Sequence, residues 1–119
     1  MFSRVLLVED DEIVRPLIAE AISLLGLEVV ECSNADEGLE ALENSRVVLV
    51  VTDVRMPGSM DGLALAKLIW SRWAGLPVII MSGDACMPAG MLPADALFLR
   101  KPCTLAALHC AIEDLLPCE

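Results

Sequence analysis

Two short aliphatic runs of this sequence end in acidic residues whose type and spacing suit phosphoryl chemistry. Glu9, Asp10 and Asp11 follow one run, and Asp53 follows another. Carboxylates packed together repel one another unless a cation joins them, and hard oxygen ligands without His or Cys suit Mg²⁺. An aspartate beside Mg²⁺ is able to attack a phosphoryl group and form an acyl phosphate. The acids therefore predict a Mg²⁺-assisted phosphoryl-transfer site.

A hydroxyl and an ammonium group occupy matching positions further along the chain. Ser82 follows the aliphatic run 78–81, and Lys101 follows closely on the run 96–99. Phosphoryl transfer requires the charge on the equatorial oxygens to be neutralised. We expect these two side chains to converge with the acids and, together with Mg²⁺, to supply that neutralisation.

Short aliphatic runs that alternate with longer amphipathic segments predict the elements that position these residues. Continuously apolar runs are typical of strands covered on both faces, and apolar residues three and four apart are typical of helices. This alternation predicts an α/β fold with a parallel sheet between two layers of helices, in which ligands bind outside the carboxyl ends of the strands. Expected strands occupy 5–8, 27–31, 47–52, 78–81 and 96–99. Expected helices occupy 12–25 and 61–73, and two more begin at residues 34 and 104.

Local signals predict where some of these elements begin and end. The segment 34–37, Asn-Ala-Asp-Glu, resembles a capping box that starts a helix, and Gly26 is expected to end the first helix. Two prolines and a glycine within 84–94 disfavour a regular helix there. We expect this fourth helical segment to be short or irregular.

The composition narrows the classes of function. The 119 residues are enough for one domain, and the apolar content of 56% excludes intrinsic disorder. No apolar window approaches the roughly 18 residues of a membrane span, so no membrane association is expected. The net charge of −10 disfavours nucleic-acid binding and favours a cation or a basic protein surface. Five cysteines without a CxxC pair indicate reduced thiols in a cytoplasmic protein.

Five motifs, in order along essentially the whole chain, resemble those of the response-regulator receiver domains of two-component systems. They are LVEDD at 7–11, VTDVRMP at 51–57, MDG at 60–62, VIIMSG at 78–83 and FLRKP at 98–102. The resemblance implies a single receiver domain over 1–119, with a flavodoxin-like, doubly wound sheet of five parallel strands in the order 2-1-3-4-5. It also implies a phosphoprotein of phosphorelay signal transduction, phosphorylated by a histidine kinase or a histidine phosphotransfer protein.

The resemblance implies a role for each acid of the expected site. Asp53 is expected to be the phosphoacceptor. Asp10 and Asp53 are expected to bind Mg²⁺ through their carboxylates, with the backbone carbonyl of Arg55 as a third ligand. Glu9 is expected to act on the metal through water, and Asp11 is expected to start the helix instead of binding the metal.

The same resemblance implies how phosphorylation is read. Ser82 takes the family's Thr/Ser switch position, and Lys101 is expected to pair with a phosphoryl oxygen. Phe98 takes the aromatic switch position but lacks a hydroxyl, so any switching there is expected to occur by packing. We expect no turnover enzyme and no output domain, so that the signal passes to a downstream protein target by contact or by onward phosphotransfer. The sequence makes no prediction of an oligomeric state.

Two segments depart from the commonest form of the family. The turn at 56–62 is one residue longer, and the stretch 82–98 is a few residues shorter. Both features resemble stand-alone receivers and the receiver modules of hybrid histidine kinases.

Two other functions compete with this interpretation. A small Mg²⁺-dependent phosphatase usually has a second Asp two positions after its nucleophile, where this chain has Arg55. The alternative within the receiver fold is an interaction module that no longer depends on phosphorylation. The complete set of acids, with Ser82 and Lys101, argues against that module, and Mg²⁺ binding without phosphorylation would favour it.

Overall fold

The structure, a computed structural model, contains one sheet of five parallel strands. It describes residues 3–53, 62–73, 75–82, 96–100 and 105–115. The strands are β1 (Arg4–Val8), β2 (Glu28–Cys32), β3 (Leu49–Asp53), β4 (Val78–Ser82) and β5 (Ala96–Arg100). Their order is β2-β1-β3-β4-β5, and each neighbouring pair is parallel. The predicted α/β class and the predicted strand order are confirmed.

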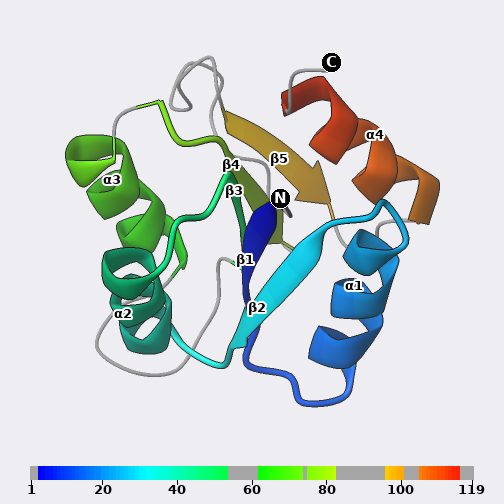
Figure 1. Ribbon diagram of the computed structural model, residues 1–119, viewed down its shortest axis with the longest axis horizontal. Coiled ribbons are helices and arrows are strands. Elements are labelled where there is room, and N and C mark those ends of the chain that lie inside the picture. The colour runs from blue at the N-terminus through cyan, green and yellow to red at the C-terminus, as the bar shows by residue number, and fades with distance from the viewer. Residues whose placement is uncertain (1–2, 54–61, 74, 83–95, 101–104, 116–119) are drawn as a thin grey trace.

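Helices cover both faces of this sheet (Figure 1). In the described part of the chain they are α1 (Val14–Ser23), α2 (Ala35–Asn44), α3 (Gly62–Arg72) and α4 (Leu105–Leu115). One face packs against α1 and α4, and the other face packs against α2 and α3. The segment 84–94, for which a short or irregular helix is predicted, lies outside the described residues.

The central strands are buried on both faces, which explains their continuous apolar runs. Successive side chains of a strand point to opposite faces of the sheet. In β1, Val5 and Leu7 pack against the layer of α1 and α4, whereas Leu6 and Val8 pack against the layer of α2 and α3. All four side chains have no exposed surface. A strand between two helical layers therefore needs apolar residues at every position.

Four of the strands, β2, β3, β4 and β5, end one residue later than the sequence predicts. Asp53 is the last residue of β3 and pairs with Met81, and Ser82 is the last residue of β4 and pairs with Arg100. Backbone hydrogen bonds of a sheet do not depend on side-chain polarity, so the ladder continues into the polar residues. As a result the sheet holds the main chain of Asp53.

The first helix is shorter at both ends than the predicted range 12–25. α1 starts at Val14, and the turn that follows it ends at Gly26, whose φ of +82° lies in the left-handed region that favours glycine. Among the described helices, none is both long enough and apolar enough to cross a lipid bilayer.

Candidate functional site

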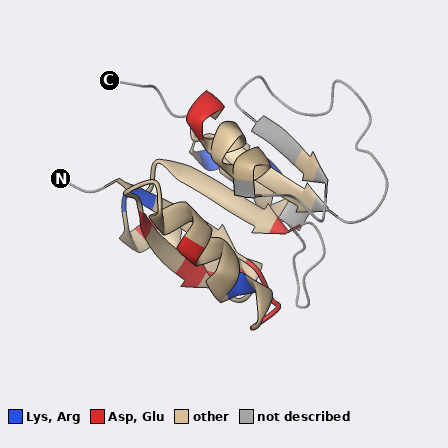
Figure 2. Cartoon of the chain, turned by 90° about the vertical axis from the view of Figure 1, so that its right-hand side faces the viewer, with Lys and Arg blue, Asp and Glu red and all other residues tan. Residues whose placement is uncertain are grey.

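Three carboxylates meet at the carboxyl-terminal edge of the sheet. Carboxylate oxygens of Glu9, Asp10 and Asp53 all lie within 4.8 Å of one another. The register of the two neighbouring strands causes this, because Val8 of β1 pairs with Thr52 of β3 and the acids follow directly on each. Figure 2 shows the acidic residues after β1 and at the end of β3 on the side toward which the strand arrows point.

The three acids differ in burial. Glu9 is 1% exposed and Asp53 is 8% exposed, whereas Asp10 is exposed. Two sides of the cluster are therefore closed by protein, and the third opens to water. A metal ion that binds here is able to keep several water ligands on the Asp10 side, as Mg²⁺ usually does in proteins.

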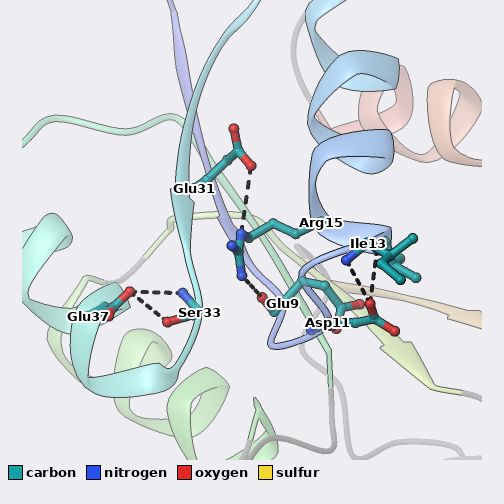
Figure 3. A network of polar contacts seen from close by, with 8 residues as sticks. Glu9, Asp11, Ile13, Arg15, Glu31, Ser33 and Glu37 are labelled. Carbon is teal, nitrogen blue, oxygen red and sulfur yellow. Dashed lines mark hydrogen bonds and ion pairs between the residues drawn. The ribbon is translucent and has the colours of Figure 1, made fainter.

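Main-chain groups hold Glu9 in the buried position. Its backbone N–H donates to the Cys32 carbonyl oxygen at 3.0 Å, which extends the pairing of β1 with β2 by one residue. Its side-chain Oε2 accepts a hydrogen bond from the Asp11 backbone N–H at 3.2 Å. These contacts are shown in part in Figure 3 and fix where the buried carboxylate lies.

Asp11 serves the helix and not the carboxylate cluster. Its Oδ1 accepts hydrogen bonds from the backbone N–H groups of Ile13 at 2.8 Å and Val14 at 3.2 Å. Its carbonyl oxygen accepts from the Arg15 N–H at 2.9 Å. Asp11 thus satisfies N–H groups at the start of α1 that have no partner within the helix. This is the helix-start position that the sequence predicts for it.

The donor set fits Mg²⁺. Ligands of an octahedral Mg²⁺ lie at about 2.0–2.1 Å, so two opposite ligands are roughly 4.2 Å apart. The carboxylate oxygens of the cluster lie within 4.8 Å of one another, which is only slightly wider. A small closure of the cluster, or one ligand acting through water, brings the three acids into reach of a single ion. Oxygen ligands alone also favour Mg²⁺ over zinc or copper.

The other predicted site residues are placed only in part. The backbone of Ser82 lies at the end of β4, beside the strand that carries Asp53, and Phe98 of β5 pairs with Ile80. Their side chains lie outside the described part of the chain, as do Arg55 and Lys101 altogether. The roles of these four residues remain predictions.

The sequence analysis does not predict a role for Arg15, which lies beside the site. The Arg15 guanidinium donates to the Glu9 carbonyl oxygen at 3.0 Å (Figure 3). The one sequence feature that could have indicated this contact is the position of a basic residue one helical turn after Asp11. Charge alone does not distinguish such a residue from an ordinary exposed arginine on a helix.

Cys32 lies next to the acids but has no thiolate chemistry at neutral pH. Burial and, to a smaller extent, the charge of Glu37 raise the pKa of the Cys32 thiol to about 11. The thiolate is the form that binds metals and acts as a nucleophile. Cys32 therefore acts as an apolar residue of the core, and metal binding falls to the carboxylates.

The start of α2 stands beside the end of β2 and contains the predicted capping box. Asn34 Oδ1 accepts from the Glu37 N–H at 2.8 Å. The Glu37 carboxylate accepts from the backbone N–H of Ser33 at 2.9 Å and from its hydroxyl at 3.0 Å, instead of from Asn34. These hydrogen bonds hold the pKa of Glu37 below its ordinary value of 4.5, and the bond from the Ser33 backbone has the larger effect.

The Glu37 contacts predict a pH dependence of stability. A lowered carboxyl pKa means that Glu37 stabilises the fold above its unfolded-state pKa, and that this contribution is lost as the pH falls through the lower folded-state pKa. Ser33→Ala removes the hydroxyl donor and leaves the backbone donor. We expect the pKa of Glu37 to rise part of the way toward 4.5. An NMR titration of the Glu37 side chain measures it, and an unchanged pKa would contradict the assigned cause.

A cleft lies at the opposite end of the sheet from the three carboxylates. Its volume is about 670 Å³, and it is bounded by the ends of α2 and α3, with Glu43, Arg46 and Trp73 in its lining. In the described part of the chain, the cluster of three carboxylates is at the other edge. The cleft and the carboxylate cluster therefore lie at different places. We assign the functional site to the carboxylates because they supply metal-binding groups.

Comparison with known proteins agrees with this geometry. The family model described as "Response regulator receiver domain" matches residues 5–113. Response regulator protein FleR of Pseudomonas aeruginosa is 38% identical over 112 residues, which are 91% of this chain and 23% of FleR. The DNA-binding transcriptional regulator NtrC of Escherichia coli is 40% identical over 84 residues, 71% of this chain and 18% of NtrC. The chain thus spans about a quarter or less of the length of these relatives.

Solved structures show the same fold. A receiver protein from Sinorhizobium medicae superposes with a TM-score of 0.88 at 27% identity, covering 96% of this chain and 94% of that one. The receiver domain of the hybrid histidine kinase CckA gives a TM-score of 0.80 at 31% identity, covering 97% and 100%. TrrA of Thermotoga maritima, solved in complex with Mg²⁺ and BeF, gives a TM-score of 0.87 at 24% identity, covering 97% and 100%.

Proposed function

The chain belongs to the response-regulator receiver domain family, and on this premise we propose that it is the phosphoacceptor of a phosphorelay. Asp53 receives a phosphoryl group from a phosphohistidine in a Mg²⁺-dependent step. The observation that carries the proposal is the convergence of Glu9, Asp10 and Asp53 within 4.8 Å at the carboxyl-terminal edge of the sheet. Receivers are regulatory domains, and self-phosphorylation and autodephosphorylation are the reactions that we assign to this one.

Asp53 is suited to act as the nucleophile because the sheet fixes its position. A carboxylate oxygen attacks phosphorus, the O–P bond forms and the P–N bond of the phosphohistidine breaks. The electron pair of the broken bond stays on the imidazole, which takes up a proton as it leaves. When bound, Mg²⁺ supplies charge neutralisation at the phosphoryl oxygens. Asp10, Asp53 and the backbone carbonyl of Arg55 would hold the ion directly and Glu9 would hold it through water. Ser82 and Lys101 would contact the remaining phosphoryl oxygens.

The surface next to the acids supports a protein partner. Ile13 is 78% exposed and Leu17, one helical turn later, is 62% exposed. Large aliphatic side chains exposed on one helix face beside a reactive group are typical of an interaction site. We propose that a histidine kinase or histidine phosphotransfer protein of the cytoplasm docks here. The phosphorylated receiver then switches a surface that is read by a downstream protein.

Intact-protein mass spectrometry tests the proposal. The protein is incubated with acetyl phosphate, with and without Mg²⁺. A gain of one phosphoryl group with Mg²⁺, and none when the ion is removed by EDTA, is the expected result. A protein that gains no phosphoryl group from acetyl phosphate or from a phosphorylated histidine phosphotransfer domain, yet still binds Mg²⁺, would contradict it. That outcome would favour the phosphorylation-independent interaction module.

A further inference from the structure

Arg15 reaches back from α1 across the loop that carries the acids. Its Nη1 donates to the Glu9 main-chain carbonyl at 3.0 Å, and its Nε lies 3.7 Å from Oε1 of Glu31 on β2. The Arg15 side chain is only 19% exposed. Figure 3 shows the Arg15 guanidinium between Glu31 on β2 and Glu9, which follows β1.

The peptide group that Arg15 contacts is the one that joins two acids of the site. The Glu9 carbonyl belongs to the peptide bond between Glu9 and Asp10. The torsion angles on either side of that peptide, ψ of Glu9 and φ of Asp10, set the direction of the Asp10 carboxylate relative to the Glu9 carboxylate. A hydrogen bond from a charged donor is stronger than one between neutral groups, so it restrains these torsion angles.

The main chain of Arg15 is also held in place. The Arg15 backbone N–H donates to the Asp11 carbonyl at 2.9 Å, and the Asp11 carboxylate accepts from Ile13 and Val14. The segment from Glu9 to Arg15 is thereby closed by contacts at residues 9 and 11. The first turn of α1 acts as a rigid base from which the guanidinium holds the loop.

We propose that Arg15 is a positioning residue for the phosphoryl-transfer site, which holds the Glu9–Asp10 peptide so that both carboxylates face the metal. The inference rests on the proposed function, because it assigns Arg15 to the metal site of that reaction. Groups that orient metal ligands without touching the metal typically change metal affinity by about 10–100-fold when removed. An ordinary surface ion pair has no such effect on a distant site.

The test is a titration of the full chain with Mg²⁺ alone. Binding is measured from the NMR chemical shifts of the backbone amides. Arg15→Met keeps much of the side-chain length and removes all donors. We expect Mg²⁺ affinity to fall about tenfold, and the Asp10 amide shift to change even before Mg²⁺ is added. Arg15→Lys retains the charge and one donor, and should restore most of the affinity.

Arg4→Met is the matched control. Arg4 also pairs with a glutamate of β2, Glu28 at 3.1 Å, but at the opposite end of the sheet. Glu31→Gln isolates the second contact of Arg15 and should leave Mg²⁺ affinity within about twofold, since the hydrogen bond to Glu9 remains. An affinity loss in Arg15→Met that Glu31→Gln reproduces would overturn the assignment to the Glu9 carbonyl.

The outcomes separate this inference from the proposed function. Wild-type protein that binds Mg²⁺ and is phosphorylated, with Arg15→Met and Arg4→Met equal in Mg²⁺ affinity, overturns the inference alone. Wild-type protein that neither binds Mg²⁺ nor gains a phosphoryl group overturns both. If Arg15→Met does not fold, Arg15→Gln, which removes the charge, is compared with Arg4→Gln. A lower Mg²⁺ affinity in the first supports the inference, and equal affinities overturn it.

Discussion

Asp53→Asn gains no phosphoryl group from acetyl phosphate, whereas wild-type protein gains one. The amide has nearly the size and shape of the carboxylate, so β3 and its pairing with Met81 are retained. Its oxygen and nitrogen are far weaker nucleophiles than a carboxylate oxygen, and no acyl phosphate forms. The loss is therefore complete and is not explained by unfolding. Intact-protein mass spectrometry measures it, with circular dichroism as the check on the fold.

Asp114→Asn provides the matched control for this loss. Asp114 is exposed on α4, and the substitution removes the same charge from a position outside the carboxylate cluster. It should be phosphorylated to the wild-type extent. A phosphoryl group on the Asp53→Asn protein would show that another side chain is the acceptor.

Asp10→Asn removes most of the stabilisation that Mg²⁺ gives the protein. At a Mg²⁺ concentration about 100 times the Kd, a ligand that binds only the folded state adds about 2.7 kcal/mol to the free energy of unfolding. Removing a residue that only orients a metal ligand typically lowers metal affinity about 10–100-fold. Removing a direct ligand should therefore lower Mg²⁺ affinity by about 100-fold or more. A 100-fold weaker site would leave a gain of only about 0.4 kcal/mol at the same concentration.

Without Mg²⁺ the same substitution has the opposite sign. Like charges 4.8 Å apart in water repel by about 0.9 kcal/mol, and Asp10 lies at this distance or closer to two other acids. Asp10→Asn relieves both repulsions and is therefore expected to raise the free energy of unfolding by up to about 2 kcal/mol in metal-free buffer. The site thus gives up stability for metal binding, as active sites often do.

Urea unfolding with and without Mg²⁺ measures both effects. Glu12→Gln is the control, because Glu12 is an exposed acid in the same loop and outside the carboxylate cluster. It should keep the wild-type response to Mg²⁺. If Asp10→Asn and wild-type protein respond equally to Mg²⁺, the metal binds elsewhere.

The sequence predicts the layered fold well because strands that are buried on both faces have continuous runs of aliphatic residues. Five aliphatic runs mark the strands, and the family motifs add their order, which the structure reproduces. The ends of the elements are harder to predict. Asp53 belongs to β3 because main-chain pairing continues past the last apolar residue. α1 begins at Val14, where the Asp11 carboxylate accepts hydrogen bonds from the N–H groups of Ile13 and Val14.

The site was predictable in its residue types and less so in its contacts. Acids that end neighbouring parallel strands must share an edge of the sheet, so the meeting of Glu9, Asp10 and Asp53 follows from the topology. Side-chain conformations do not follow from spacing. Glu37 turns to Ser33 instead of Asn34, and His109 Nε2 lies 2.8 Å from the Ala21 carbonyl oxygen of α1. Each contact depends on packing between elements that the linear pattern does not encode.

The central claim is that Asp53 carries the phosphoryl group, and chemical mapping of the modified residue tests it most directly. The protein is phosphorylated with acetyl phosphate and Mg²⁺ and then reduced with sodium borohydride, which converts an aspartyl phosphate to homoserine. Peptide mass spectrometry then locates the homoserine. Homoserine at position 53 and at no other aspartate is the predicted result. Homoserine at position 10 or at another aspartate, with position 53 unchanged, would contradict the account.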